Sequence, residues 1–377
     1  MSATAVLSII GTSKVNLFGL SGEERLRRQF ARAGITSLVA VDDLASVPGP
    51  VIMVRADASL DPPLVQALIN QPGLVLTTEQ GIPLAGHVKQ GGAQSLRDVL
   101  ENPDRKSAMA LNYRAPSQLD ANFWKALRKK ETPYALLTTP QSAASDEWRM
   151  FMGTYKGATD VVTKHLWPRP AFYATRFLAP LGVTPNMVTC VAAVFTALAF
   201  YLFLKGDYAI GLIAAWAMTF LDTVDGKLAR TTLTSSKWGD VFDHGIDLVH
   251  PPFWYWAWGA GLSAWDITWS PQLFGWVIGI ILAGYVLQRV MEGISIKWLG
   301  LEIHIWRPID TFFRQITARR NPNLILLTLA TLIQKPDWGL IAVAAWTALC
   351  LVLHGLQLLQ AFAAKRAAPL QSWMSAK

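Results

Sequence analysis

Four aspartates beside long apolar segments constrain this chain more than any other feature. The stretch 221–247 reads LDTVDGKLARTTLTSSKWGDVFDHGID. Asp222 and Asp225 are three residues apart and Asp243 and Asp247 are four apart, so each pair shares one face of a helix. Carboxylates are costly inside a bilayer and mark functional sites there. Because Mg²⁺ and related hard cations take oxygen ligands, the four aspartates predict a divalent-cation site.

The composition indicates that much of the chain lies in a membrane. Of the 377 residues, 52% are hydrophobic and 16% are charged, against about 25% charged in soluble domains. The net charge of +8 favours an anionic partner. Because the basic residues adjoin apolar segments and no nucleic-acid-binding motif occurs, we expect membrane lipids as partners and no nucleic acid.

Six apolar segments predict an all-α domain with six transmembrane helices. The loops at 230–238 and 291–321 are the most basic ones, which predicts that they face the cytoplasm. Both termini and the acidic site would then lie on the cytoplasmic side of the inner membrane. The predicted spans are 186–204, 208–229, 240–263, 271–290, 322–335 and 338–361.

The chain before these spans predicts a cytoplasmic α/β domain at residues 1–140. Short apolar runs alternate with helical stretches, which favours a mainly parallel sheet covered on both faces. The predicted strands are Ala5–Ile10, Ser37–Val41, Val51–Val54 and Gly73–Thr77, and the predicted helices are Glu23–Ala33, Pro63–Asn70, Ser95–Glu101 and Ser117–Lys130.

A connector at 141–183 joins this domain to the membrane domain at 184–362, and 363–377 form a cytoplasmic tail. Basic and aromatic residues alternate in the segment 157–180, just before the first span. Such a mixture predicts an amphipathic helix that lies in the membrane interface.

The acidic stretch resembles the signature of the CDP-alcohol phosphatidyltransferase family. That signature is DxxDGxxAR, eight residues, then GxxxDxxxD, and every fixed position is present here. The resemblance implies an integral membrane transferase that moves a substituted phosphate from a CDP-linked donor to a hydroxyl acceptor and releases CMP. It also implies two bound divalent ions, Mg²⁺ or Mn²⁺, and a homodimer. The donor stays open between CDP-diacylglycerol and a soluble CDP-polyol, and the acceptor between a polyol phosphate and a lipid.

The same resemblance implies roles for individual residues. Asp222, Asp225, Asp243 and Asp247 would bind the metal ions, and Asp247 would also take the proton from the acceptor hydroxyl. Small residues let a nucleotide approach the backbone closely. Lys237, in the loop between the two halves of the signature, is a further candidate for a phosphate contact. The predicted nucleotide-binding residues are Asp222, Gly226, Ala229, Arg230, Gly239 and Lys237.

The N-terminal domain resembles sugar-phosphate nucleotidyltransferases, which are fused to the phosphotransferase in inositol-phosphate cytidylyltransferase/di-inositol-phosphate phosphate synthase enzymes. It departs from their pattern at the nucleotide-binding loop. The segment Ile10–Lys14 has one glycine and lacks GxGxR, and Ala56-Asp57 stands where that family has Gly-Asp. We therefore expect a degenerate domain, with Lys14 and Asp57 as surface charges, that serves as a scaffold.

Three other functions use the same features. The chain could be a non-catalytic membrane scaffold that displays its soluble domain. It could be a transporter that couples the acidic cluster to protons or cations. It could also be a bifunctional enzyme that makes its own CDP-alcohol, which the missing glycine-rich loop disfavours.

Overall fold

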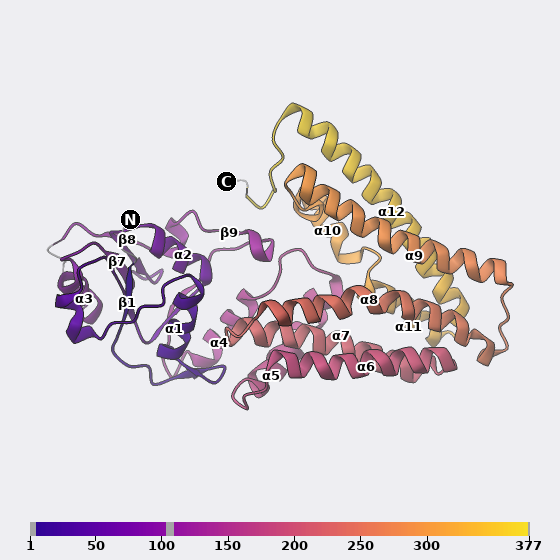
Figure 1. The fold of residues 1–377 in the computed structure, drawn as a ribbon, viewed down its shortest axis with the longest axis horizontal. Coiled ribbons are helices and arrows are strands. Elements are labelled where there is room, and N and C mark those ends of the chain that lie inside the picture. The colour runs from indigo at the N-terminus through magenta and orange to yellow at the C-terminus, as the bar shows by residue number, and fades with distance from the viewer. Residues whose placement is uncertain (1–4, 103–108, 376–377) are drawn as a thin grey trace. The chain divides into compact units, whose positions relative to one another are not determined.

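The computed structural model describes residues 5–102 and 109–375, and the chain divides into two compact units. The first unit contains most of the N-terminal residues, and the second contains most of the long helices. Figure 1 follows the chain from its N-terminal strands to these helices by colour. The first unit comprises 1–155, 175–182 and 227–234, and the second comprises 156–174, 183–226 and 235–377.

A five-stranded mixed sheet forms the centre of the first unit, in the order β1-β4-β7-β6-β8 (Figure 1). β1 is parallel to β4 and β6 to β8, whereas β7 is antiparallel to both β4 and β6. The predicted mainly parallel sheet is therefore mixed. The strands are β1 Val6–Ile10, β4 Val51–Arg55, β6 Leu74–Thr77, β7 Pro83–Val88 and β8 Asn112–Arg114.

The difference comes from β7, which the apolar pattern does not predict. Only residues 78–82 separate β6 from β7, and so short a connection can join only antiparallel strands. The predicted strand Ser37–Val41 is reduced to one bridge between Leu38 and Leu7.

Helices cover both faces of this sheet, as predicted. Successive residues of a strand point to opposite faces, so Ile52 of β4 packs in one core cluster and Met53 in another. The Ile52 side is covered by α1 (Gly22–Arg32) and α2 (Pro62–Asn70), and the Met53 side by α3 (Ala93–Glu101). The three corresponding predicted helices are confirmed.

The predicted helix Ser117–Lys130 is wrong. Arg128 has a φ of 48°, a left-handed conformation that ends any helical run and turns the chain into a short antiparallel hairpin. The segment instead forms the 3₁₀ turns η2 (Pro116–Gln118) and η3 (Lys125–Leu127) and the strands β9 (Phe123–Trp124) and β10 (Lys129–Lys130). The remaining elements of this unit are β2 Asn16–Leu17, β3 Leu20–Ser21, η1 Val41–Ser46, β5 Ala58–Leu60, β11 Ala135–Leu137 and α4 Ala143–Gly153.

The second unit is helical. Four helices within the described residues are long and apolar enough to cross a membrane, at Pro185–Leu204, Tyr208–Thr231, Pro271–Leu299 and Pro336–Ala367. Its helices are η4 Val162–Leu166, α5 Pro168–Leu178, α6 Pro185–Lys205, α7 Tyr208–Thr231, α8 Lys237–Gly261, η5 Leu262–Trp265, α9 Pro271–Ile294, η6 Ser295–Leu299, η7 Ile303–Ile305, α10 Pro308–Ile316, α11 Arg320–Leu332 and α12 Pro336–Ala367; α5 and α7 extend into the first unit.

The other two predicted spans coincide with α8 and α11 and stay predictions. α11 has 13 residues, about 20 Å at the helical rise, which is shorter than the ~30 Å hydrocarbon core of a bilayer. α8 carries Pro251 and Pro252 in its interior, so the carbonyls of Asp247 and Leu248 lose their helical donors. The Tyr285 hydroxyl of α9 donates to the Leu248 carbonyl at 2.9 Å in compensation.

Aromatic residues fix the ends of the long helices against one another. Tyr208, at the start of α7, stacks on Trp258 of α8 with ring centroids 4.2 Å apart and donates to the Trp258 carbonyl at 2.6 Å. The Trp258 indole in turn donates to the carbonyl of Pro336 at 2.9 Å, at the start of α12. α6 packs along α8, and α12 along α9 and α11. These contacts set the register in which the acidic residues of α7 and α8 meet.

Candidate active site

Asp222 of α7 and Asp247 of α8 are joined through one guanidinium group. Arg320 Nη2 donates to Asp222 Oδ2 at 2.5 Å, and its Nη1 donates to Asp247 Oδ1. The side chains of Arg320 and Asp222 are 14% and 18% exposed, whereas Asp247 is 37% exposed. Two carboxylates and one guanidinium leave this group with one net negative charge. The group is partly exposed at Asp247.

Sequence reasoning did not identify Arg320 as part of this group. It is the first residue of α11, where the positive end of the helix dipole disfavours a cation. A buried arginine at that position needs carboxylate partners, and two are supplied from other helices. The sequence did contain a signal for this ion pairing. Arg319 and Arg320 directly precede the fifth apolar segment, and another part of the chain, 221–247, is unusually acidic.

Asp225 lies one turn after Asp222 on α7 and is 3% exposed. Its Oδ2 accepts a hydrogen bond of 2.6 Å from the hydroxyl of Thr189 on α6. A carboxylate at this depth is stabilised by such a donor. Helix α6 therefore fixes the orientation of the second predicted metal ligand.

Asp243 is the fourth aspartate of the predicted set, and its side chain lies outside the described residues. Its backbone belongs to α8, one turn before Asp247. Among the side chains that the structure does describe, no three of His, Cys, Asp or Glu come close enough to hold a metal ion. The oxygen donors of Asp222, Asp225 and Asp247 nevertheless have the chemistry that Mg²⁺ and Mn²⁺ prefer, and their charge exceeds that of Arg320. The complete cage stays a prediction.

Gly239 and Lys237 occupy the first turn of α8. Ser236 caps this helix, with its hydroxyl accepting from the Gly239 amide at 3.0 Å. A Cβ on Gly239 would lie 2.9 Å from Asn186 Oδ1 of α6, so only glycine fits without moving that side chain. Lys237 is exposed. Gly226 and Ala229 belong to α7 itself, and the nucleotide contact predicted for these residues stays a prediction.

The last turn of α7, which holds Arg230, belongs to the first compact unit. Arg25 of α1 donates to the carbonyl of Thr231 at 2.8 Å and to that of Leu17 at 2.5 Å. Arg28 donates to the carbonyl of Thr232 at 3.0 Å. Carbonyls at a helix C-terminus lack helical donors, so cations satisfy them well. Burial lowers the pKa of Arg25 to about 10, which leaves it charged at neutral pH.

Lys227, in a variable position of the signature, is also bound by this unit. Its side chain is 3% exposed, and the ammonium lies 2.9 Å from the ring centroid of Tyr155 and 5.7 Å from that of Phe151. A buried ammonium over aromatic faces is a cation–π arrangement. The end of the helix that carries Asp222 and Asp225 is therefore fixed by both main-chain and side-chain contacts.

A second polar cluster lies among α9, η7 and the start of α11. Glu292 Oε2 is 3.2 Å from Arg289 Nη1, and its Oε1 pairs with Arg319 and lies 3.1 Å from His304 Nε2. Burial lowers the pKa of His304 to about 3, so its imidazole is neutral at physiological pH. Because His304 carries no charge and Glu292 is saturated by cations, this cluster is suited to structural support.

The segment after β1, where sugar-phosphate nucleotidyltransferases carry their nucleotide-binding loop, is closed. Arg55 Nε and Nη2 donate to the two oxygens of Asp57 at 2.9 and 2.8 Å. The space beside Asp57 measures about 10 Å³, enough for one water molecule. A Cβ on Gly22 would lie 1.9 Å from the Ala56 carbonyl oxygen, so α1 begins directly against this loop. Lys14 is exposed.

Comparison with known proteins gives one family. The family model described as CDP-alcohol phosphatidyltransferase matches residues 182–319. Archaetidylinositol phosphate synthase of Pyrococcus horikoshii is 31% identical over 174 residues, which cover 45% of this chain and 81% of that protein. Choline/ethanolaminephosphotransferase 1 of Arabidopsis thaliana is 34% identical over 122 residues, 28% of this chain and 30% of that protein. Cholinephosphotransferase 1 of Danio rerio is 32% identical over 85 residues, 22% of each chain.

Proposed function

We propose that this chain, a membrane transferase that belongs to the CDP-alcohol phosphatidyltransferase family, joins a CDP-linked lipid to a phosphorylated polyol and releases CMP. The observation that carries this proposal is the group of Asp222, Asp247 and Arg320, in which two signature carboxylates from two helices meet. The choice of substrates rests on the relative named archaetidylinositol phosphate synthase, because the match covers 81% of that protein. The choline-type relatives named above are matched over less than a third of their length.

An apolar groove next to Asp247 supports a lipid donor. It has a volume of about 670 Å³ and lies between α6 and α8. Its wall includes Phe200 of α6 and Ile246, Val249 and Phe253 of α8. Ile246 directly precedes Asp247, so a hydrocarbon chain in this groove would bring its head group to the carboxylates. Burying each methylene contributes roughly 0.8 kcal/mol.

The reaction that we propose is an in-line displacement at the phosphorus that carries the lipid. The acceptor oxygen forms a bond to that phosphorus, the bond to the bridging oxygen breaks, and CMP leaves with the electron pair. Asp247, the most exposed of the described site carboxylates, accepts the hydroxyl proton. Asp222, Asp225 and Asp243, together with Asp247, would bind two ions, Mg²⁺ or Mn²⁺, which would neutralise the phosphate oxygens of the donor and of the departing CMP.

The nucleotide contacts are part of the same proposal. Gly226, Ala229 and Gly239 would leave room for the cytidine, and Arg230 and Lys237 would bind phosphate oxygens. Arg320 keeps Asp222 and Asp247 together, and its charge offsets their mutual repulsion. Each of these residues lies within or between the two halves of the signature, except Arg320.

For the membrane topology, we propose six spans with both termini and the site in the cytoplasm. The four apolar helices support an integral membrane protein, and α8 and α11 would complete the six. The basic loops 230–238 and 291–321 support the orientation. The homodimer implied by the family is an expectation of the same proposal.

The α/β unit would act as a scaffold for the end of α7. The closed loop beside Asp57 disfavours nucleotidyl transfer, and Arg25 and Arg28 contact the carbonyls that follow Arg230. These contacts connect a domain without a nucleotide loop to the signature helix. A bifunctional enzyme would instead turn over CTP, which purified protein should not do.

The test is CMP release by purified full-length protein in detergent. CDP-diacylglycerol and CDP-inositol serve as alternative donors, each with inositol phosphate, glycerol phosphate or diacylglycerol as acceptor, with Mg²⁺ or Mn²⁺. We expect release with CDP-diacylglycerol and a polyol phosphate, and a fall of about 10²–10⁴-fold in Asp247→Asn.

The matched control is Asp266→Asn, an exposed aspartate with a φ of 56°, which asparagine also tolerates. It should leave release unchanged. Release only with CDP-inositol would overturn the lipid donor. Folded protein without release from any donor would favour the scaffold or, if Asp247→Asn abolished uptake of a cation, the transporter.

A further inference from the structure

The hydroxyl of Thr189 holds one oxygen of a carboxylate in the proposed metal site. Thr189 of α6 is 5% exposed and Asp225 of α7 is 3% exposed. Thr189 Oγ1 lies 2.6 Å from Asp225 Oδ2 and 3.1 Å from the carbonyl oxygen of Pro185, one turn earlier in α6. A separation of about 2.6 Å is typical of a hydroxyl that donates to an ionised carboxylate. The hydroxyl proton therefore binds Asp225 more strongly than it binds Pro185.

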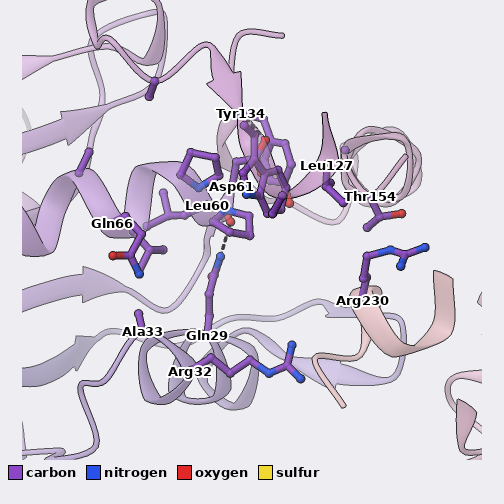
Figure 2. A pocket seen from close by; sticks show the side chains of 18 of the residues that line it. Gln29, Arg32, Ala33, Leu60, Asp61, Gln66, Leu127, Tyr134, Thr154 and Arg230 are labelled. Carbon is purple, nitrogen blue, oxygen red and sulfur yellow. Dashed lines mark hydrogen bonds between the residues drawn. The ribbon is translucent and has the colours of Figure 1, made fainter. Parts of the chain in front are cut away.

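Asp61, in the α/β unit, is a buried aspartate without such a donor. It is also 3% exposed, and Figure 2 shows it beside Tyr134 at the wall of a cavity of about 780 Å³. Its Oδ2 receives a long contact of 3.5 Å from the Tyr134 amide, and no residue in the described parts of the chain donates to its Oδ1. Burial raises the pKa of Asp61 to about 6. Burial alone therefore does not supply a short hydrogen bond, and the bond from Thr189 is a specific feature of the candidate site.

The start of α6 fixes the position of this donor. Thr184 caps the helix, with its hydroxyl accepting from the Met187 amide at 3.3 Å, and Pro185 is the first helical residue. A threonine in a helix has few χ1 rotamers, and one of them points Oγ1 toward the carbonyl four residues earlier. Thr189 adopts an arrangement of this kind, because its Oγ1 reaches both Pro185 and Asp225. Asp225 therefore meets a donor that the helix holds in place.

A fixed donor limits how Asp225 can bind a cation. Ca²⁺ takes about 6–8 oxygen ligands and accepts both oxygens of one carboxylate, whereas Mg²⁺ needs a near-octahedral set of oxygens at ~2.0–2.1 Å. Mn²⁺ shares the octahedral preference. Asp225 would have to lose the bond from Thr189 in order to turn both of its oxygens toward one ion. The loss of that bond disfavours Ca²⁺ more than it disfavours an ion that binds through a single oxygen.

We propose that Thr189 is a positioning residue that shifts the preference of the carboxylate site away from Ca²⁺ and toward Mg²⁺ and Mn²⁺. Its hydroxyl keeps Asp225 Oδ2 engaged, so Asp225 binds an ion through one oxygen and the site offers Ca²⁺ fewer ligands. The inference rests on the proposed function, because it requires a metal ion at Asp225. It adds a choice among ions that the spacing of the four aspartates does not contain.

The test is the thermal shift of purified full-length protein in detergent, freed of metal with EDTA and then titrated with Mg²⁺, Mn²⁺ or Ca²⁺. The concentration dependence of the melting temperature gives a dissociation constant for each ion and needs no turnover. Thr189→Val keeps the volume of the side chain and removes the hydroxyl. We expect it to lower the ratio of the Ca²⁺ to the Mg²⁺ dissociation constant at least tenfold, equal to about 1.4 kcal/mol. Thr189→Ser keeps the hydroxyl and should leave the ratio within about twofold.

The matched control is Thr331→Val, at a buried threonine of α11 whose hydroxyl donates to the Leu327 carbonyl of its own helix at 2.9 Å. It makes the same chemical change at a hydroxyl that binds a carbonyl rather than a carboxylate, so the ratio should not change. Thr189→Cys carries a weaker donor and should shift the ratio in the same direction as Thr189→Val. This second variant keeps the test decisive if Thr189→Val does not fold.

The outcomes separate this inference from the proposed metal site. Ions that still bind Thr189→Val with an unchanged ratio would overturn the inference and leave the metal site standing. An equal shift of the ratio in Thr331→Val would also overturn it, because the effect would then not depend on Asp225. Failure of the unchanged protein to bind any of the three ions would overturn the metal site, and this inference with it.

Discussion

The aspartates of the two compact units differ in how fully arginine balances their negative charge. Asp57, in the α/β unit, has both oxygens bound by Arg55, two residues before it in the chain. Asp222 and Asp247, in the helical unit, come from two helices and share one guanidinium from a third. A carboxylate whose charge is balanced one-to-one by a neighbouring guanidinium offers no net charge to a cation. Carboxylates that outnumber their cation keep a negative field that a metal ion or substrate can use.

The largest difference between the units should appear when each aspartate is neutralised. Asp222→Asn removes a charge from the candidate site, and we expect CMP release to fall at least about 100-fold. Asp57→Asn removes only a partly exposed ion pair, which contributes about 1 kcal/mol or less, and should leave release within about twofold. Steady-state CMP release measures both. A catalytic defect in Asp57→Asn would mean that the α/β unit also takes part in the chemistry.

Removal of Arg320 should show whether a metal ion can replace its guanidinium as the cation bound by Asp222 and Asp247. In Arg320→Gln the carboxylates of Asp222 and Asp247 lose their cation, and breaking such a buried pair costs about 3–5 kcal/mol. We expect a melting temperature several degrees lower in EDTA, and a larger gain on addition of Mg²⁺ or Mn²⁺ than the unchanged protein shows. Differential scanning fluorimetry in detergent measures this. Equal metal-induced shifts in the two proteins would contradict a metal site at these carboxylates.

A smaller effect is expected where the α/β unit contacts the signature helix. Arg25→Met removes two charge-assisted hydrogen bonds to main-chain carbonyls, each worth about 1.5–3 kcal/mol. We expect kcat to fall roughly tenfold, because a 1.4 kcal/mol change in the positioning of α7 has that effect. Arg27→Met, an exposed change on the same helix, is the control. An unchanged kcat in Arg25→Met would contradict the scaffold function proposed for the α/β unit.

The smallest effect concerns Asp61. Its pKa in the folded protein is about 6, above the unfolded value near 3.8, so the folded state binds the proton more tightly. Asp61 therefore favours folding at low pH, and this contribution disappears as the pH rises from about 4 to about 6. We expect Asp61→Asn to raise the melting temperature by a few degrees above pH 6, and the gain to shrink toward pH 4. Lys129, Arg149 and Glu131 act on the same carboxyl group. A gain that does not depend on pH would contradict the assigned pKa.

The sequence predicted those parts of the molecule that depend on local pattern. The signature spacing identified the family, and four of the six predicted spans have the length and apolar character of membrane helices. Alternating apolar runs predicted β1, β4 and β6, but β7 has Pro83, Gly86 and His87 among its six residues and looks like a loop. Its burial between β4 and β6 depends on pairing across the sheet, which no local pattern contains.

The candidate site shows the same limit. The spacing of Asp222 and Asp225 follows from helix geometry, so a sequence is enough to place them one turn apart. Arg320 lies 98 residues from Asp222 in the chain, and only the packing of α11 brings it to the carboxylates. Arg25 and Lys227 were missed for a related reason, because their partners are main-chain carbonyls and ring faces that carry no sequence signature.

The two prolines of α8 make this helix easier to bend next to the candidate site. Pro251 and Pro252 lack the N–H groups that would donate to the carbonyls four residues earlier, so two successive hydrogen bonds of the helix are missing. The first of the missing bonds is the one to the carbonyl of Asp247. A helix bends most easily where its ladder is interrupted. Asp247 therefore lies where α8 is able to bend, and bending there would move its carboxylate relative to the aromatic contacts at Trp258.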